Sequence, residues 1–259
     1  MRKLITIALA AVAFLSITGS ANAADAALLA TNDFVGISFW IVSMGCLAAT
    51  AFFFLERGSV APAWRVSITV AGLVTGIAFI HYMYMREVWI ATGESPTVYR
   101  YIDWLITVPL LMLEFYFVLA AVKKVPSSVF WKLLIGSLVM LIGGYAGEAG
   151  YVSAMVGFIV GMAGWIYILY EIFSGEAGTI AAKSGNKSLI TAFSAMRIIV
   201  TVGWAVYPLG YMFGYLTSGG ADVNTLNIVY NAADFLNKIA FGLIIWACAM
   251  QNTSARSAR

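Results

Sequence analysis

The chain has 259 residues, of which 62% are hydrophobic and 10% are charged, and its mean hydropathy is +0.90. Soluble domains carry roughly 25% charged residues, so this composition excludes an ordinary soluble protein and indicates an integral membrane protein. The formal net charge of +3 comes from basic residues in short loops, which does not indicate a nucleic-acid-binding surface. Cys46 and Cys248 lie inside apolar spans, where neither suggests a disulfide framework or a metal site.

Residues 1–23 have the pattern of a cleaved signal peptide. Arg2 and Lys3 precede an apolar stretch at 4–17, and the small residues of a cleavage site follow at 21–23. We therefore expect the mature chain to begin near Ala24 on the outer side of a bacterial inner membrane, although an uncleaved first helix is the alternative. The expected organisation is a membrane domain at 24–251 and a short cytoplasmic tail at 252–259.

Seven apolar spans follow the signal sequence, and each is long enough to cross a bilayer as a helix. They lie at 34–55, 65–86, 99–122, 129–147, 151–173, 189–216 and 224–250. The connections are short and no internal repeat is evident. The sequence therefore predicts an all-α membrane protein, a single seven-transmembrane helix bundle with no second domain.

The basic residues gather in alternate loops, which predicts the orientation of the bundle. These loops and the tail hold Arg57, Arg65, Lys123, Lys124, Lys132, Lys183, Lys187, Arg256 and Arg259. Cytoplasmic loops are enriched in lysine and arginine, so we expect the N-terminus outside and the C-terminus in the cytoplasm.

The third span carries charged residues in an otherwise apolar helix. Arg100 and Asp103 are three residues apart and can pair on one helical face. Glu114 lies close to three whole turns after Asp103, about 16 Å along the same face. This spacing is unsuited to a contact pair and favours a relay with a carboxyl group on each side of a central group. Thr107 lies one turn from Asp103. In this apolar setting, we expect Glu114 to be protonated at rest, whereas Asp103, beside the positive charge of Arg100, should remain ionised.

The sixth span contributes aromatic residues at mid-depth and a proline. Trp204 and Tyr207, like Trp104 and Trp165 in other spans, either pack the core or line a pocket for a long apolar ligand. Pro208 predicts a kink, because proline cannot donate the helical hydrogen bond.

The seventh span places Asp234 and Lys238 four residues apart near the middle of the membrane. An ionisable side chain there costs about 2.5–3.5 kcal/mol on insertion scales, so it suggests a functional site. The pair either neutralises itself as a structural ion pair or serves a lysine that carries an aldehyde as a Schiff base. Spacing alone leaves both interpretations open. His81, the only histidine, either forms a local hydrogen bond or contacts Asp103.

Four stretches together resemble the microbial (type 1) rhodopsins, and within that family the proteorhodopsins. They are GLVTGIAFIHYMYM (72–85), SPTVYRYIDWLITVPLL (95–111), GWAVYPLGY (203–211) and NAADFLNKIAFGLIIW (231–246). The resemblance implies all-trans retinal bound to Lys238 as a protonated Schiff base. Asp103 then matches the proton acceptor, Asp234 a second counterion and Glu114 the cytoplasmic proton donor.

The resemblance assigns further residues around these four. Arg100 matches the arginine beneath the counterions, His81 the partner of the acceptor, and Trp104, Trp165, Trp204, Tyr207 and Pro208 match the retinal pocket. Leu111 stands where family members carry leucine, associated with green absorption, or glutamine, associated with blue, so a green-absorbing pigment is implied. The family forms pentamers and hexamers, which implies a homo-oligomer in the lipid bilayer.

The implied function is light-driven outward proton transport rather than enzymatic catalysis. Asp103, Thr107 and Glu114 suit a proton as cargo, because similar sodium pumps carry Asn and Gln at the first and last of these positions. One alternative is a photosensor that signals to a transducer, although sensors commonly lack a carboxylic donor such as Glu114. Another is a transporter or receptor without retinal, in which Lys238 and Asp234 are structural. Arg197 departs from the family pattern inside the sixth span, where it either extends to the inner surface or alters proton uptake.

Overall fold

The computed structural model describes residues 28–217 and 222–257. The expected signal peptide at 1–23 and the expected start of the mature chain near Ala24 lie outside these residues. In chain order the helices are α2 (Phe34–Glu56), α3 (Arg65–Thr92), α4 (Thr97–Ala120), α5 (Ser127–Glu148), α6 (Ala154–Phe173), α7 (Glu176–Ala182), α8 (Lys187–Ile198), α9 (Val206–Tyr211) and α10 (Val223–Ser257).

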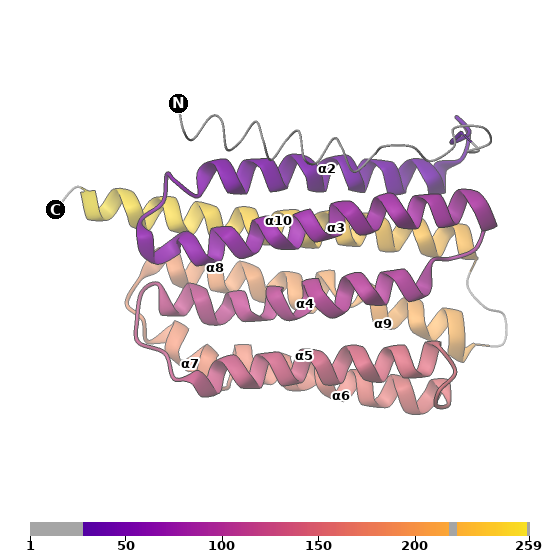
Figure 1. Ribbon diagram of the computed structural model, residues 1–259. Helices are drawn as coiled ribbons and strands as arrows, with labels where there is room; N and C mark the ends of the chain where they lie inside the picture. Colours follow the sequence, from indigo (N-terminus) through magenta and orange to yellow (C-terminus); the bar gives the residue numbers. More distant parts are fainter. Residues whose placement is uncertain (1–27, 218–221, 258–259) are drawn as a thin grey trace.

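Seven helices in the described part of the chain are long and apolar enough to cross a membrane, with Lys187–Leu216 counted as one broken helix. They run side by side along one axis (Figure 1). The predicted seven-helix bundle is therefore confirmed. We call the end that holds the start of α2 and the α3–α4 and α5–α6 connections the first end, and the opposite end, where α10 finishes, the second end.

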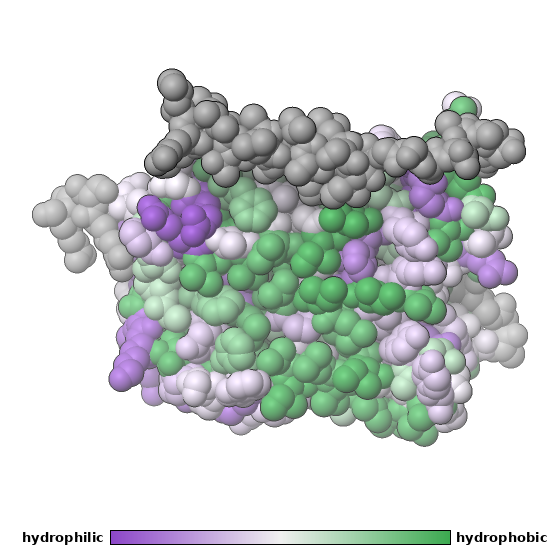
Figure 2. Space-filling model, viewed as in Figure 1, coloured by the Kyte–Doolittle hydropathy of each residue, from purple (hydrophilic) through white to green (hydrophobic). Residues whose placement is uncertain are grey.

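The outer face of the bundle is apolar, and the charged residues of its spans lie inside it. Hydrophobic residues cover most of the middle of the visible face, and hydrophilic residues lie mainly toward the two ends (Figure 2). Apolar side chains such as Ile198 and Val202 are 62% and 68% exposed, whereas Arg100, Asp103 and Lys238 are 3% exposed or less. Charged groups in a membrane helix face the interior of the bundle, where partners can be found.

The sixth helix breaks where Pro208 was expected to kink it. Pro208 has no N–H to donate to the carbonyl of Trp204, which a regular helix would require. The N–H of Tyr207 donates to that carbonyl oxygen instead, at 3.1 Å. The preceding segment, Ile199–Gly203, is π-helical, and the N–H of Trp204 bonds to the carbonyl of Ile199. Single π-helical turns are frequent at functional sites.

Two features of the second end differ from the sequence-based boundaries. The short helix α7 lies where only a connection was expected, and the buried carboxylate of Glu171 accepts a hydrogen bond from the N–H of Ala177 in its first turn. Helix α10 continues to Ser257, so residues 252–257 of the expected tail extend the last helix instead. Hydropathy detected neither feature, because both segments are short or polar.

Candidate functional site

A lysine between two carboxylates forms the centre of the bundle. Nζ of Lys238 lies 2.7 Å from Oδ2 of Asp103 and 2.6 Å from Oδ2 of Asp234. Asp103 comes from α4, whereas Lys238 and Asp234 are one turn apart on α10. All three side chains are buried, so each charge relies on the others in place of water. The structure thus brings together three of the residues that the sequence singled out.

Asp234 is held by three further donors. The hydroxyl of Tyr82 donates to its Oδ2 at 2.8 Å, Nε1 of Trp104 donates to the same atom at 3.1 Å, and the hydroxyl of Tyr207 donates to Oδ1. Hydrogen bonds to a carboxylate favour its charged form. Tyr82 was not predicted as a site residue, because an isolated tyrosine in an apolar span gives no signal of its partner.

Arg100 does not pair with Asp103, in contrast to the expectation from their spacing. Its guanidinium donates to Oδ1 of Asn227 at 2.8 Å and to Oδ1 of Asn231 at 2.7 Å, and also reaches the Tyr82 hydroxyl at 3.2 Å. Helical side chains tilt toward the N-terminus of their helix, so Arg100 extends toward the first end and away from Asp103. Asn227 and Asn231, one turn apart on α10, were not predicted.

The surroundings of Asp103 are asymmetric. Its Oδ2 binds Lys238, and the hydroxyl of Thr107 lies 3.5 Å from the same atom while it donates to the backbone carbonyl of Asp103 at 2.9 Å. Its buried Oδ1 has no hydrogen-bond partner in the described part of the chain. His81 is half-buried on α3, and no hydrogen bond joins it to Asp103 within the described residues.

Glu114 lies deeper along α4, toward the second end, and is fully buried. Within the described residues, neither of its carboxyl oxygens has a hydrogen-bond partner. The hydroxyl of Ser67, also buried and without a partner there, and the backbone of Ala71 on α3 are its polar neighbours. A charged carboxylate without partners is strongly disfavoured in such a place, so this site suits the neutral acid.

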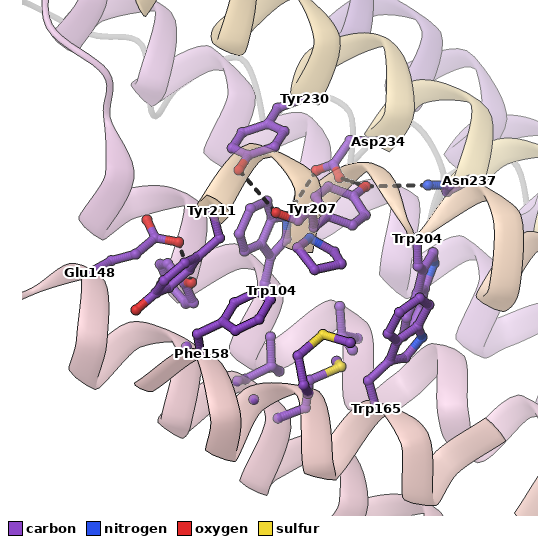
Figure 3. Close-up of a pocket in the computed structure, with 18 of the residues that line it drawn as sticks. Trp104, Glu148, Phe158, Trp165, Trp204, Tyr207, Tyr211, Tyr230, Asp234 and Asn237 are labelled. Atoms are coloured by element: carbon purple, nitrogen blue, oxygen red, sulfur yellow. Dashed lines mark hydrogen bonds between the residues drawn. The ribbon is translucent and has the colours of Figure 1, made fainter. Parts of the chain in front are cut away.

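An aromatic cavity extends from Lys238 (Figure 3). All six residues expected in a ligand pocket line it, namely Trp104, Leu111, Trp165, Trp204, Tyr207 and Pro208. Glu148, Phe158 and Asn237 also line it and were not predicted. Glu148 accepts a hydrogen bond from the hydroxyl of Tyr101 at 2.7 Å.

Comparison with known proteins agrees with this geometry. The model of the family described as "Bacteriorhodopsin-like protein" matches residues 33–252. The blue-light absorbing proteorhodopsin of Gamma-proteobacterium Hot 75m4 is 52% identical over 255 residues, which cover 98% of this chain and 99% of the relative. The green-light absorbing proteorhodopsin of Gamma-proteobacterium EBAC31A08 is 54% identical over 226 residues, which cover 87% of this chain and 90% of the relative.

A solved structure shows the same fold. The crystal structure of the blue light-absorbing proteorhodopsin from Med12 is 56% identical in sequence and has a TM-score of 0.74. The match covers 85% of this chain and 100% of that chain. On this evidence, the chain belongs to the bacteriorhodopsin-like family and, within it, to the proteorhodopsins.

Proposed function

We propose that this protein is a light-driven outward proton pump that carries all-trans retinal on Lys238. The observation that carries the proposal is the position of Nζ of Lys238, which lies between Asp103 and Asp234 in the lining of an aromatic cavity. The cavity fits a long apolar aldehyde, because rings form its walls and, among its lining residues, Lys238 is the only amine. When bound through an imine at Nζ, retinal supplies light absorption and a light-driven reorientation of the N–H.

The proton path follows from the residues of α4. Asp103 is the better acceptor for the proton on Nζ, since its Oδ1 has no hydrogen-bond partner among the described residues, whereas Asp234 already accepts from three other donors. Glu114, neutral in its apolar site, returns a proton to Nζ from the opposite side. Thr107 fixes Asp103 from the adjacent turn. A neutral donor on one side and a charged acceptor on the other give the transport its direction.

The first end of the bundle is proposed to face outward. Asp103 lies on that side of Glu114 along α4, and the loops at the second end carry Arg57, Lys123 and Lys183. The protein would then lie in the bacterial inner membrane with its C-terminus in the cytoplasm and a signal peptide removed at 1–23. We further propose a pentamer or hexamer, and green absorption because the leucine at Leu111 lines the cavity.

The test is light-induced acidification by cells or vesicles that contain the protein and all-trans retinal. We expect a visible absorption band and a reversible fall in the pH of the outer medium of right-side-out cells, abolished by a protonophore. The absence of a visible band would establish a retinal-free transporter or receptor. A band without acidification would favour a photosensor. Alkalinisation of the medium by right-side-out cells would reverse the proposed direction.

A further inference from the structure

The break in the sixth helix frees a backbone carbonyl beside the candidate site. In a regular α-helix, the N–H of Tyr207 would bond to the carbonyl of Gly203, four residues earlier. In this protein the N–H of Tyr207 donates to the carbonyl of Trp204 instead, because Pro208 has no N–H to donate to it. The carbonyl of Gly203 therefore needs another donor, since a buried backbone oxygen without one is costly.

That donor is a side chain of α10. Nδ2 of Asn237 donates to the carbonyl of Gly203 at 3.1 Å, and Asn237 is 6% exposed. A Cβ atom at position 203 would overlap the amide oxygen of Asn237, so a larger residue there would displace the Asn237 amide from this contact. Asn237 immediately precedes Lys238 in the chain and lines the same cavity (Figure 3).

The same amide also reaches the counterion. Nδ2 of Asn237 lies 3.3 Å from the hydroxyl oxygen of Tyr207, whose own proton is donated to Oδ1 of Asp234. A donor at the oxygen of a hydroxyl polarises it and strengthens the hydrogen bond that the hydroxyl donates. A continuous chain of contacts therefore runs from the break in the sixth helix to the carboxylate beside Lys238.

We propose that Asn237 is a positioning residue that couples the break in the sixth helix to the counterion Asp234 through Tyr207. The effect on Asp234 concerns the pigment and so rests on the proposed function. The contact between Asn237 and the sixth helix does not depend on retinal. Movement of the sixth helix at its break would alter the contact of Asn237 with Gly203 and Tyr207, and with it the hydrogen bonding of Asp234.

The first experiment tests the contact with the sixth helix in the retinal-free protein. Asn237→Leu removes the donor and retains a similar volume. Asn252→Leu is the matched control, because Asn252 is an amide on the same helix that bonds Asn186, Ser188 and the Cys248 carbonyl instead. Hydrogen–deuterium exchange of the segment 199–211, read by mass spectrometry, should accelerate by about twofold or more in Asn237→Leu alone. Equal exchange in the two variants would overturn the coupling to the break.

The second experiment is a double-mutant cycle read by the colour of the pigment. Asn237→Leu should shift the absorption maximum to shorter wavelength, because a weaker bond from Tyr207 leaves more negative charge on Asp234 near Nζ. In a Tyr207→Phe background, the same change should give no further shift, since Tyr207 transmits the effect. Equal shifts in both backgrounds, or no shift in either, would indicate a packing role and overturn the inference. If the unmodified protein forms no pigment, the proposed function fails instead, and the exchange experiment still decides the contact with the break.

Discussion

Lys238 and Asp103 form a buried ion pair across two helices, with Nζ 2.7 Å from Oδ2, and the second aspartate, Asp234, lies at a similar distance from the same nitrogen. Two carboxylates and one ammonium group cannot be separated cheaply in an apolar interior, because removal of one partner leaves charge without compensation. The role proposed for each of these residues can therefore be tested by a separate substitution.

Lys238→Ala should abolish the visible band after addition of all-trans retinal, because no amine remains in the cavity to bind the aldehyde. Absorption spectroscopy of purified protein measures this directly. Lys132→Ala is the control, since Lys132 pairs with Glu176 at the second end of the bundle and should leave the band unchanged. A band that persists in Lys238→Ala would show that another amine holds the chromophore.

Asp103→Asn should shift absorption to the red and stop outward pumping. The negative carboxylate stabilises positive charge at Nζ more in the ground state than in the excited state, so its loss narrows the energy gap. Acidification of the unmodified pigment should produce the same red shift, because protonation also removes the negative charge of Asp103. Spectra and light-induced pH changes recorded across mild acid test both. If Asp103→Asn still acidifies the medium, another group is the acceptor.

Glu114→Gln should bind retinal and release the proton from Nζ in light, but recovery should slow by roughly 10²–10⁴-fold, the usual contribution of a positioned acid. Flash spectroscopy follows this recovery. Glu171→Gln is a matched control, a buried carboxyl group toward the same end whose oxygens bind the N–H of Ala177 and approach Lys132. Equal recovery in Glu114→Gln and the unmodified protein would restrict Glu114 to a packing role.

Leu111→Gln should shift the absorption maximum to the blue, because Leu111 lines the cavity and the new amide places a dipole against the bound chromophore. Leu111→Ile serves as the control, since it stays apolar and should leave the colour nearly unchanged. The spectrum of the unmodified pigment tests the green assignment itself. A blue maximum in a protein that carries leucine at this position would show that other lining residues set the colour.

The sequence predicted much of the architecture because hydropathy follows single helices. The seven spans depend on local periodicity, and the structure confirms them. It also buries Asp103, Glu114 and Lys238 inside the bundle. Contacts between helices could not be predicted in this way, because hydropathy does not show which helices pack together. The spacing of Arg100 and Asp103 suggested a pair, but the tilt of the side chain and the two asparagines of α10 decided otherwise.

Hydrogen bonds between residues of different helices could not be predicted from the sequence for the same reason. The contact of Asn237 with Gly203 depends on where Pro208 frees a carbonyl and on how α10 packs there. The sequence also made Arg197 look unusual, although the structure gives it ordinary partners. Its Nε donates to the carbonyl of Ile172 at 2.6 Å and its guanidinium lies over the ring of Phe193, so a residue that looked anomalous has local partners near the end of α6.

The neutral partners of Arg100 have a consequence for the electrical balance of the interior. Asn227, Asn231 and Tyr82 accept its hydrogen bonds but cancel none of its charge. Arg100 and Lys238 therefore supply two positive charges, and Asp103 and Asp234 supply two negative charges, so the formal sum of the four is zero. Transfer of a proton from Nζ to Asp103 leaves this sum unchanged, and no ion has to follow. In the proposed pump, only the departure of a proton toward the first end would leave these four groups with a net negative charge, and arrival of a proton from the second end would restore their neutrality.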